Sequence, residues 1–412
     1  MALASTWRIA WRNLGRNRKR TALALLAICV AQLALLFTNA LMHGYADAMI
    51  DAVTGPMLGH VQVHARGWRD EHAMDQSLDD VGAKLTAVRR VTGVERASAR
   101  IYAPALAARD VDGHTVIVLG LDPSAESGAE GLLEPVPRSK LPRGRSVLVG
   151  AGLAETMGLH VGDELAIVGQ AADGSIANDL FTVSGTLSSS VELVQRTGVV
   201  MSLDAAQTLF AMPDQAHELV VRSRRADDAD VLAATLARLP ALRRTEVLPW
   251  RKLAPELVTL VQLTEASSLI VFLLVFVAAA AGITNTMLMA TFERIRELGM
   301  LLALGTTPRR IVAMILAEAI ALGLLGAVLG TVLGVALVVG TAHSGLDLLT
   351  LGNDAAREIS FEGMNYHFAI VPRMESADVI EGIVAVLVTS GVAALWPAIH
   401  AGRLQPVEAM RT

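Results

Sequence analysis

Few side chains of this sequence stand in an arrangement that predicts catalysis or metal binding. Seven histidines are scattered over one long segment, at His43, His60, His64, His72, His114, His160 and His217. His60 and His64 are four residues apart in an alternating stretch, and we interpret them as surface histidines of a strand, not as a metal pair. Neither H-E-x-x-H nor G-x-S-x-G occurs, and Ser188-Ser189-Ser190 is typical of a loop. We therefore predict no catalytic residue and no metal site.

The sequence also lacks the motif that binds the phosphates of ATP. A P-loop requires glycine directly before its lysine. The residues before the four lysines are Arg18, Ala83, Ser139 and Arg251. We therefore expect this chain to bind no cofactor itself.

The elements that must carry the function are membrane spans. The 412 residues are 53% apolar and only 18% charged, whereas soluble domains carry about 25% charged residues. Cys29 is the one cysteine, so no intrachain disulfide forms, and the net charge of −5 does not indicate a nucleic-acid binder. Four uncharged stretches are each long enough to cross a bilayer of about 30 Å: residues 21–41, 266–292, 319–346 and 382–399.

Charge bias sets the predicted orientation. The head and the loop after the second span are rich in arginine, whereas the loop before the fourth span is acidic, so both termini are expected in the cytoplasm. The first span is predicted to be retained, although a cleaved signal peptide is the alternative. The predicted order is an amphipathic cytoplasmic helix (1–20), a first span (21–42), an extracytoplasmic domain (43–254), a stalk with the second span (255–292), a cytoplasmic loop helix (293–310), a third span (311–346), an outer loop (347–381), a fourth span (382–400) and a cytoplasmic tail (401–412).

The predicted fold class is therefore a membrane protein with four transmembrane α-helices and a large α+β domain between the first and second. Short alternating runs and helical periods mix throughout residues 43–254, and we expect two subdomains, the outer one inserted near residues 145–212. Residues 255–292 are too long for one span, since 38 helical residues extend about 57 Å. A continuous helix there would act as a lever, and a break near Thr264 is the alternative.

The third span carries two features of note. Gly323, Gly326, Gly330 and Gly334 form a small-residue groove that permits close helix packing, either within one chain or between two chains. Glu318 lies in the same span, and we expect Arg296 or Arg294 to pair with it, in preference to a proton-transfer role.

The loop at residues 293–311 has the pattern of a short amphipathic helix, with Gly305 as its expected C-cap and Pro308 as the start of the next helix. The stretch resembles the cytoplasmic loop of the FtsX-like, MacB-type permeases of ABC transporters, whose usual form is close to E-R-x-R-E-(I/L)-G-x-L-x-A-L-G. The start at residues 10–21 and the end at residues 396–411 are also typical of that family. Residues 149–163 are similar to the periplasmic domain of its macrolide-exporting and lipoprotein-releasing members.

This resemblance implies a dimer of identical or homologous permeases over two ATPase subunits, in the cytoplasmic (inner) membrane of a bacterium. ATP and Mg²⁺ would then be held by the partner ATPase, and this chain would not be an enzyme. The loop helix would couple the permease to the ATPase. The residues predicted for this coupling are Glu293, Arg294, Arg296, Glu297, Leu298, Gly299, Leu301, Leu304 and Gly305.

Within the family, residues 59–64 and 67–70 and the lack of a fused ATPase domain look most like lipoprotein-releasing permeases. We therefore expect extraction or export of a lipoprotein or another amphiphile, with an acyl-chain cavity between the outer halves of spans one and two. The predicted lining is Leu33, Phe37, Ala40 and Leu41 with Leu263, Ser267, Ile270, Val271 and Leu274. The alternative is that these residues face lipid or neighbouring helices.

The sequence is also compatible with three other functions. One is export of a drug or peptide with a periplasmic adaptor. Another is a mechanotransmission complex that transports nothing and controls a cell-envelope enzyme. A secondary transporter is the third, with Glu318 as its only good proton-binding candidate.

Overall fold

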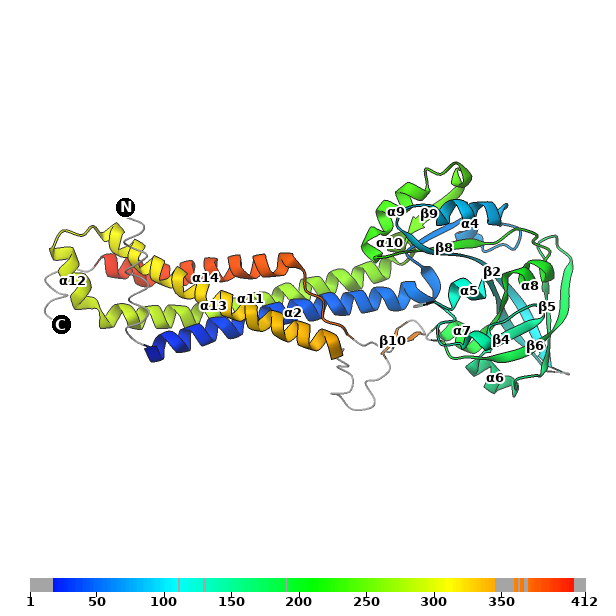
Figure 1. Cartoon of the computed structure of the whole chain (residues 1–412), viewed down its shortest axis with the longest axis horizontal. Coiled ribbons are helices and arrows are strands. Elements are labelled where there is room, and N and C mark those ends of the chain that lie inside the picture. Colours follow the sequence, from blue (N-terminus) through cyan, green and yellow to red (C-terminus); the bar gives the residue numbers. More distant parts are fainter. Residues whose placement is uncertain are drawn as a thin grey trace. The chain divides into compact units, whose positions relative to one another are not determined.

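The computed structural model of the chain describes residues 18–109, 112–128, 131–189, 191–344, 359–361, 364–366 and 370–403. It contains two compact units, which divide near Ala46 and near Leu260 (Figure 1). One unit is a bundle of helices, and the other is a mixed α+β domain formed mainly by Asp47–Thr259.

The helical unit contains the four helices that are long and apolar enough to cross a membrane, as the sequence predicts. They are α2 (Arg18–Val53), α11 (Pro255–Glu293), α13 (Pro308–Ser344) and α14 (Ser376–Gly402), with the short α12 (Ile295–Ala303) between α11 and α13. All four long helices extend beyond their predicted spans. In particular, α2 continues eleven residues past 42 and is followed by a π-helical turn at Thr54–Leu58, so the first helix does not end where its uncharged stretch ends.

The second long helix has no break. α11 is helical over 39 residues, so the helix is continuous and has no break near Thr264, and its action as a lever stays a prediction. α11 is sparsely packed, since only 6% of its most apolar stretch is buried within the chain, against 39% for that of α13.

Close packing in the bundle is concentrated among α2, α13 and α14. Ala319, Leu322, Ala394 and Ala398 are buried in one apolar cluster together with Ile28 of α2. Small side chains on α13 and α14 allow these helices to approach closely. α14 begins with a capping box in which Glu375 and Asp378 each accept a backbone N–H.

The domain is built on one nine-stranded sheet in the order β3-β7-β4-β6-β5-β2-β8-β1-β9. The strands are β1 (Val61–Ala65), β2 (Val94–Arg109), β3 (Asp112–Leu121), β4 (Ser146–Gly150), β5 (Glu164–Gln170), β6 (Ile176–Leu187), β7 (Gly198–Ser202), β8 (Glu218–Ser223) and β9 (Thr245–Pro249). Since β2 also pairs with β3, the first six strands of this order close on themselves as a barrel, while β8, β1 and β9 extend the sheet on one side.

The helices of this domain are all short. They are α3 (Trp68–Glu71), α4 (Val81–Arg89), α5 (Pro123–Glu126), α6 (Ala151–Met157), α7 (Glu192–Thr197), α8 (Leu203–Leu209), α9 (Ala229–Leu236) and α10 (Trp250–Leu253). Three 3-10 turns accompany them at Arg138–Lys140, Ala226–Asp228 and Pro240–Leu242, and a separate hairpin joins β10 (Ile359–Phe361) to β11 (Met364–Tyr366).

Strand β2 runs through both parts of the domain that the sequence predicts as two subdomains. One edge of β2 pairs with β3 over ten residues, while its other edge pairs first with β8 and then with β5. A single strand therefore connects the closed part of the sheet to its β8-β1-β9 extension, and the division into two subdomains stays a prediction.

Proline is tolerated in β2 because of where it falls. The backbone N–H of Tyr102 points away from β3 and donates to Nδ1 of His217 at 3.0 Å. Pro104, two residues on, has the same orientation. Along this edge of β2, pairing with β8 ends at Arg100 and pairing with β5 begins at Ala105. Pro104 lies between these two paired stretches, so its missing N–H removes no ladder hydrogen bond.

Some sequence predictions fall outside the described residues. These are most of the head (1–17), the end of the tail (404–412) and much of the outer loop (345–358 and 367–369).

Candidate functional site

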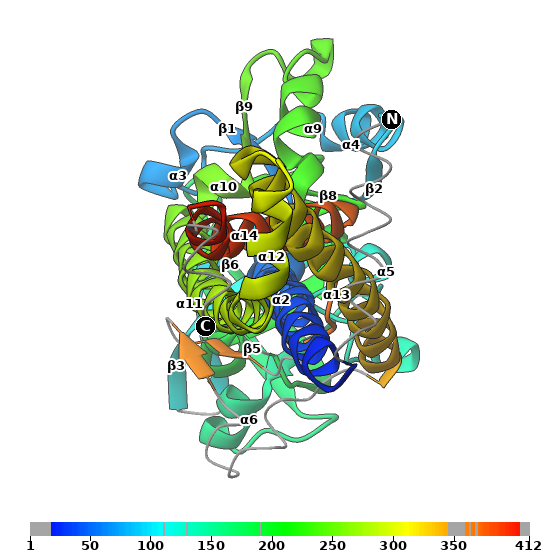
Figure 2. The same cartoon turned by 90° about the vertical axis from the view of Figure 1, so that its left-hand side faces the viewer.

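The loop between α11 and α13 folds as its sequence predicts. Gly305 has φ of +90°, its N–H donates to the carbonyl of Leu302, and the N–H of Thr306 donates to the carbonyl of Leu301, both at 3.0 Å. This pair of bonds is the Schellman ending of a helix, which favours glycine because of the positive φ. Pro308 then occupies the first position of α13, where its missing N–H is not needed. Figure 2 faces the end of the bundle that carries α12.

One face of α12 packs onto the bundle. Leu298 is only 2% exposed and belongs to the same apolar cluster as Ile311 and Ala401, while Leu302 packs against that cluster from the next turn. Gly299 is also buried. These contacts fix which way the rest of α12 points.

An ion pair holds the beginning of α12 to α13. Nη1 of Arg294 lies 3.1 Å from Oε2 of Glu318, and Nε of Arg294 lies 3.3 Å from Oε2 of Glu297. Both Arg294 and Glu318 are mostly buried, so the charges lie close together away from solvent. The expectation that Arg294 or Arg296 pairs with Glu318 is confirmed, with Arg294 as the partner.

The opposite face of α12 is uncovered by the part of the chain that the structure describes. Met300, Leu301 and Leu304 are 51%, 37% and 84% exposed. Glu293 and Arg296 are exposed as well, whereas Glu297 is half-buried. The predicted coupling set therefore divides in two, because Leu298 and Gly299 serve the bundle core while Leu301 and Leu304 are presented outward.

The glycine groove of α13 is a seam within one chain. A Cβ on Gly330 would lie 2.6 Å from Cβ of Gln32 and 2.7 Å from the carbonyl oxygen of Cys29, and one on Gly326 would lie 2.5 Å from Ile28. Gly334 faces Leu36 of the same helix α2, and Gly323 faces Ser390 of α14. Of the two arrangements left open by the sequence, the structure places these glycines against helices of the same chain.

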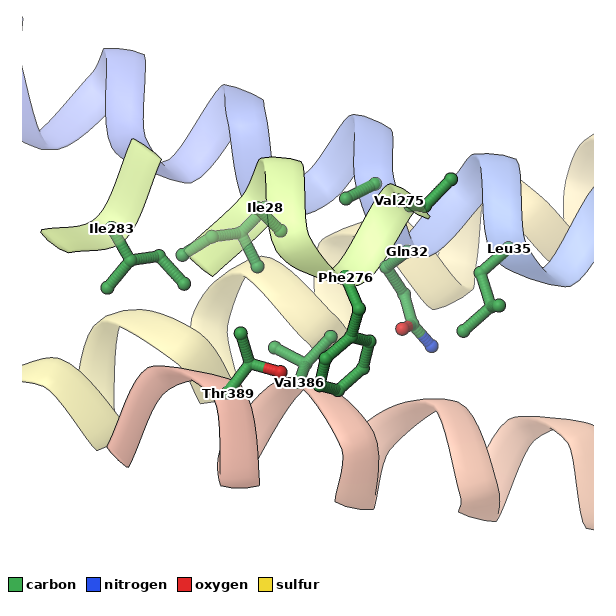
Figure 3. A pocket seen from close by; sticks show the side chains of 10 residues that line it. Ile28, Gln32, Leu35, Val275, Phe276, Ile283, Val386 and Thr389 are labelled. Atoms are coloured by element: carbon green, nitrogen blue, oxygen red, sulfur yellow. The ribbon is translucent and has the colours of Figure 1, made fainter. Parts of the chain in front are cut away.

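A small cavity of about 20 Å³ lies beside this seam. Figure 3 shows Ile28, Gln32 and Leu35 of α2 around it, with Phe276 of α11 and Thr389 of α14. Nε2 of Gln32 donates to Oγ1 of Thr331 at 3.2 Å, while Oε1 of Gln32 is buried without a partner among the described residues. The volume suits about one water molecule and is far too small for an acyl chain.

Comparison with known families identifies the kind of protein that contains the α12 loop and the α+β domain. Residues 21–239 match the MacB-like periplasmic core domain, and residues 269–406 match the FtsX-like permease C-terminal domain. The first match alone covers more than half of the chain. The chain belongs to the FtsX-like, MacB-type family of ABC transporter permeases.

The chain is also similar to individual relatives and to a solved structure. The chain is 23% identical to the lipoprotein-releasing system transmembrane protein LolC of Neisseria meningitidis, over 95% of this chain and 94% of the relative. It is also 23% identical to an uncharacterized ABC transporter permease, Rv0987, of Mycobacterium tuberculosis, over 100% of this chain and 45% of the relative. The periplasmic region of MacB from Actinobacillus actinomycetemcomitans aligns with a TM-score of 0.35 and 8% identity, over 50% of this chain and 96% of that region.

In this MacB-type permease, the residues predicted to line an acyl-chain cavity occupy two different environments. Ala40 of α2 is fully buried, and Leu33, Phe37 and Leu41 are half-buried. All five predicted residues of α11 are exposed, namely Leu263, Ser267, Ile270, Val271 and Leu274. None of the nine lines the small bundle cavity. Their role as a cavity wall stays a prediction.

The domain of this permease contains a buried ionic network that sequence reasoning missed. Arg100 of β2 is 1% exposed, and its Nε and Nη2 each donate to one carboxylate oxygen of Glu126 at 2.9 Å. Its Nη groups also donate to the carbonyls of Met57 and Pro56. Burial alone would raise the pKa of Glu126, but the paired guanidinium holds that pKa below its usual value.

A second carboxylate of the network is in a different electrostatic situation. The hydroxyl of Tyr102 donates to Oε1 of Glu218 at 2.7 Å. Burial raises the pKa of Glu218 to about 7, against the opposing attraction of Arg100. Burial likewise raises the pKa of Tyr102. Glu218 and Tyr102 both line a cavity of about 400 Å³ in this domain.

The prediction that His60 and His64 are surface histidines is wrong. Both are almost fully buried, because β1 lies between β8 and β9 and is covered on both faces. Nδ1 of His60 lies 2.9 Å from Oγ of Ser223, and His64 stacks on Trp68. Burial lowers the pKa of each histidine to about 4, so both are neutral at pH 7. The near-continuous apolar run Leu219–Val221 in the neighbouring β8 was the available signal of a central position.

Proposed function

We propose that this permease extracts or exports a lipoprotein or another amphiphile from the outer leaflet of a bacterial cytoplasmic membrane, using ATP hydrolysed by a separate subunit. In this proposal two permeases, identical or homologous, sit over two ATPase subunits that hold ATP and Mg²⁺. Both termini and α12 face the cytoplasm, and the α+β domain faces outward, in accordance with the charge bias of the loops. The extensive similarity to a relative named as a lipoprotein-releasing protein supports this substrate class.

The observation that carries the proposal is the uncovered apolar end of α12. Leu304 is 84% exposed at the end of a helix whose opposite face is locked into the bundle. Removing a leucine side chain from water contributes about 1.5–3 kcal/mol. A groove on the ATPase that receives Leu301 and Leu304 would therefore gain binding free energy and would move α12 together with α11 and α13.

The sparse packing of α11 supports the second part of the proposal. Leu263, Ile270 and Leu274 expose most of their surface in the single chain. Residues on this face can contact lipid, a second permease or the acyl chains of a substrate, and a wall formed jointly with α2 of a partner permease would bring the predicted lining together. Moving acyl chains between two apolar media changes the free energy very little, so ATP-driven closure must supply the work.

Coupling is tested by placing a charge on the outward face of α12. Leu304→Asp should weaken the interaction with the ATPase by about 2 kcal/mol, or roughly thirtyfold, and should abolish substrate-stimulated ATP hydrolysis. The measurement is ATPase activity of the complex in nanodiscs, with titration of the ATPase subunit.

Thr307→Asp is the matched control. It adds the same charge three residues away, at the exposed position before Pro308, where aspartate is a favourable N-cap. Both variants should melt at the wild-type temperature, because both positions are exposed. Normal coupling in a stably folded Leu304→Asp complex would contradict the assignment of α12.

The substrate is tested with photo-crosslinkers at Phe37 and Leu274. They should capture a lipoprotein in the nucleotide-free complex and lose it when ATP is trapped. Capture of phospholipid alone, together with capture of a soluble drug or peptide from the α+β domain, would replace this substrate with that of an exporter.

Orientation is tested by cysteine labelling after Cys29→Ser. A cysteine at Ser175, in the exposed turn before β6, should react with an impermeant reagent outside the cell, and one at Thr307 should not. The opposite pattern would invert the proposed topology.

A further inference from the structure

The α+β domain contains a cavity that the proposed function does not use. Its volume of about 400 Å³ lies within the range of small-molecule sites. Most of the lining is apolar, with Met57, Ile117, Leu119 and Val194 among its walls. A few polar side chains also line it, and these decide which ligand chemistry fits.

The strongest charges next to the cavity already satisfy one another. All three nitrogens of the Arg100 guanidinium donate to groups of the protein, and both carboxylate oxygens of Glu126 accept from Arg100. Both side chains are almost completely removed from solvent. This pair therefore contributes neither a free donor nor a net charge to a ligand.

Glu218 is the exception. Its Oε1 accepts from Tyr102, but no donor in the described part of the chain is placed on its Oε2. The residue is 3% exposed and lines the cavity. Because Glu218 lines the cavity, a ligand that brings a positively charged N–H or methylammonium group there would supply a partner for Oε2.

The surroundings of Glu218 also suit the apolar part of such a ligand. Trp68 and Tyr102 line the cavity with ring centroids 6.1 Å apart. The ring of Trp68 is held in place by His64 and His217, which stack on it at 5.8 and 5.6 Å. Aromatic rings beside a carboxylate are the side-chain combination that recognises organic ammonium groups.

We propose that this cavity binds an ammonium group attached to an apolar body, with Glu218 as its counter-ion and Tyr102 and Trp68 as its aromatic walls. Arg69 also lines this cavity. A hydrogen bond from its Nη2 to the carbonyl of Leu253 holds its guanidinium in place. The ammonium can belong to a free hydrophobic amine or to the headgroup of an aminophospholipid. This inference stands independently of the proposed lipoprotein substrate.

Proton binding at Glu218 supports the proposal. The charged and titratable groups that face it or share its cavity are Arg100 and Tyr102 of β2, Glu126 of α5, Arg69 of α3, His72 directly after α3 and His64 of β1. These neighbours do not fully replace the water that the carboxylate loses on burial, so the pKa of Glu218 is raised to about 7. An ammonium ligand requires the carboxylate form, so its affinity should fall as the pH drops below 7.

The test compares two probes that differ by one atom. Benzyltrimethylammonium and neopentylbenzene have the same shape, but only the first is charged. Binding is measured by calorimetry to the full chain in phosphatidylglycerol nanodiscs, with empty nanodiscs as the blank. We expect one saturable site at pH 8, with the cation bound at least tenfold more tightly than its neutral isostere and roughly tenfold more weakly at pH 6.

Glu218→Gln should reduce binding of the cation at least tenfold and leave the isostere unchanged. Glu246→Gln is the matched control, because that carboxylate lies on β9 in the same sheet, is 40% exposed and does not line the cavity. Replacing phosphatidylglycerol by phosphatidylethanolamine distinguishes the two sources, since competition by the lipid identifies a headgroup site and no competition identifies a site for a free amine.

Equal binding of the two probes, absence of saturable binding, or preference for phenylacetate over the cation would overturn the proposal. The comparison of probes and pH values uses the wild-type chain alone, so it decides the matter even if Glu218→Gln does not fold.

Discussion

The raised pKa of Glu218 predicts an unusual dependence of domain stability on pH. The unfolded carboxyl titrates near 4.5 and the folded one near 7. Between these values the folded state binds a proton that the unfolded state has released, so the free energy of unfolding falls as the pH rises through this window. The gap of 7 − 4.5 = 2.5 pKa units corresponds to about 3 kcal/mol.

Glu218→Gln isolates this contribution, because glutamine keeps the shape and cannot titrate. His60 and His64 have lowered pKa values and therefore act in the opposite direction, adding stability as the pH rises. They are present in both proteins, so their effect cancels in the difference. Relative to Glu218→Gln, the wild-type domain should lose about 3 kcal/mol between pH 4.5 and pH 7.5.

The assay is urea-induced unfolding of the full chain, followed by tryptophan fluorescence at a series of pH values. Trp68 and Trp250 are both buried in the domain and report on it. Glu246→Gln should follow the wild-type curve, because its carboxylate is substantially exposed. Parallel curves for wild type and Glu218→Gln would show that Glu218 is not a buried carboxyl with a raised pKa, and the reasoning would fail.

Two further predictions concern the bundle. Gly330→Leu should lower the melting temperature strongly, because its side chain would meet Gln32 and the backbone of α2, whereas Gly340→Leu, with no neighbour within 4 Å, should leave it unchanged; equal melting of the two variants would argue against the seam. Leu298→Ala should destabilise the bundle by about 2–5 kcal/mol in thermal unfolding, while Leu304→Ala should change it by less than about 0.5 kcal/mol, and the reverse order would mean that α12 is turned the other way.

Much of the membrane part could be predicted because its signals are local. Uncharged length identifies a span, and Gly305 and Pro308 mark a helix end and a helix start through backbone chemistry alone. The choice between Arg294 and Arg296 as partner of Glu318 could not be made in the same way. It depends on how α12 is rotated against α13, and that rotation is set by burial of Leu298.

The interior of the domain was harder to predict. Strand β2 is rich in alanine and contains Pro104, and both features argue against a strand when read locally. Only its three strand partners explain why the segment is extended. The ionic network joins residues of β2, α5 and β8 that are far apart in sequence, so no spacing could reveal it.

The seam between α2 and α13 limits how the bundle can change shape. Glycines recur every fourth residue along it, about 6 Å apart. A screw movement of α13 by one residue, about 1.5 Å along its axis with a rotation of about 100°, would bring Ala327, Thr331 and Val335 to positions where α2 leaves no room for a side chain. Helices α2 and α13 therefore fit together only at the fixed spacing of these glycines, and their interface resists gradual sliding. α11 has few buried contacts by comparison, so a displacement of α12 of the kind proposed would meet less resistance along α11, while α13 would carry α2 with it.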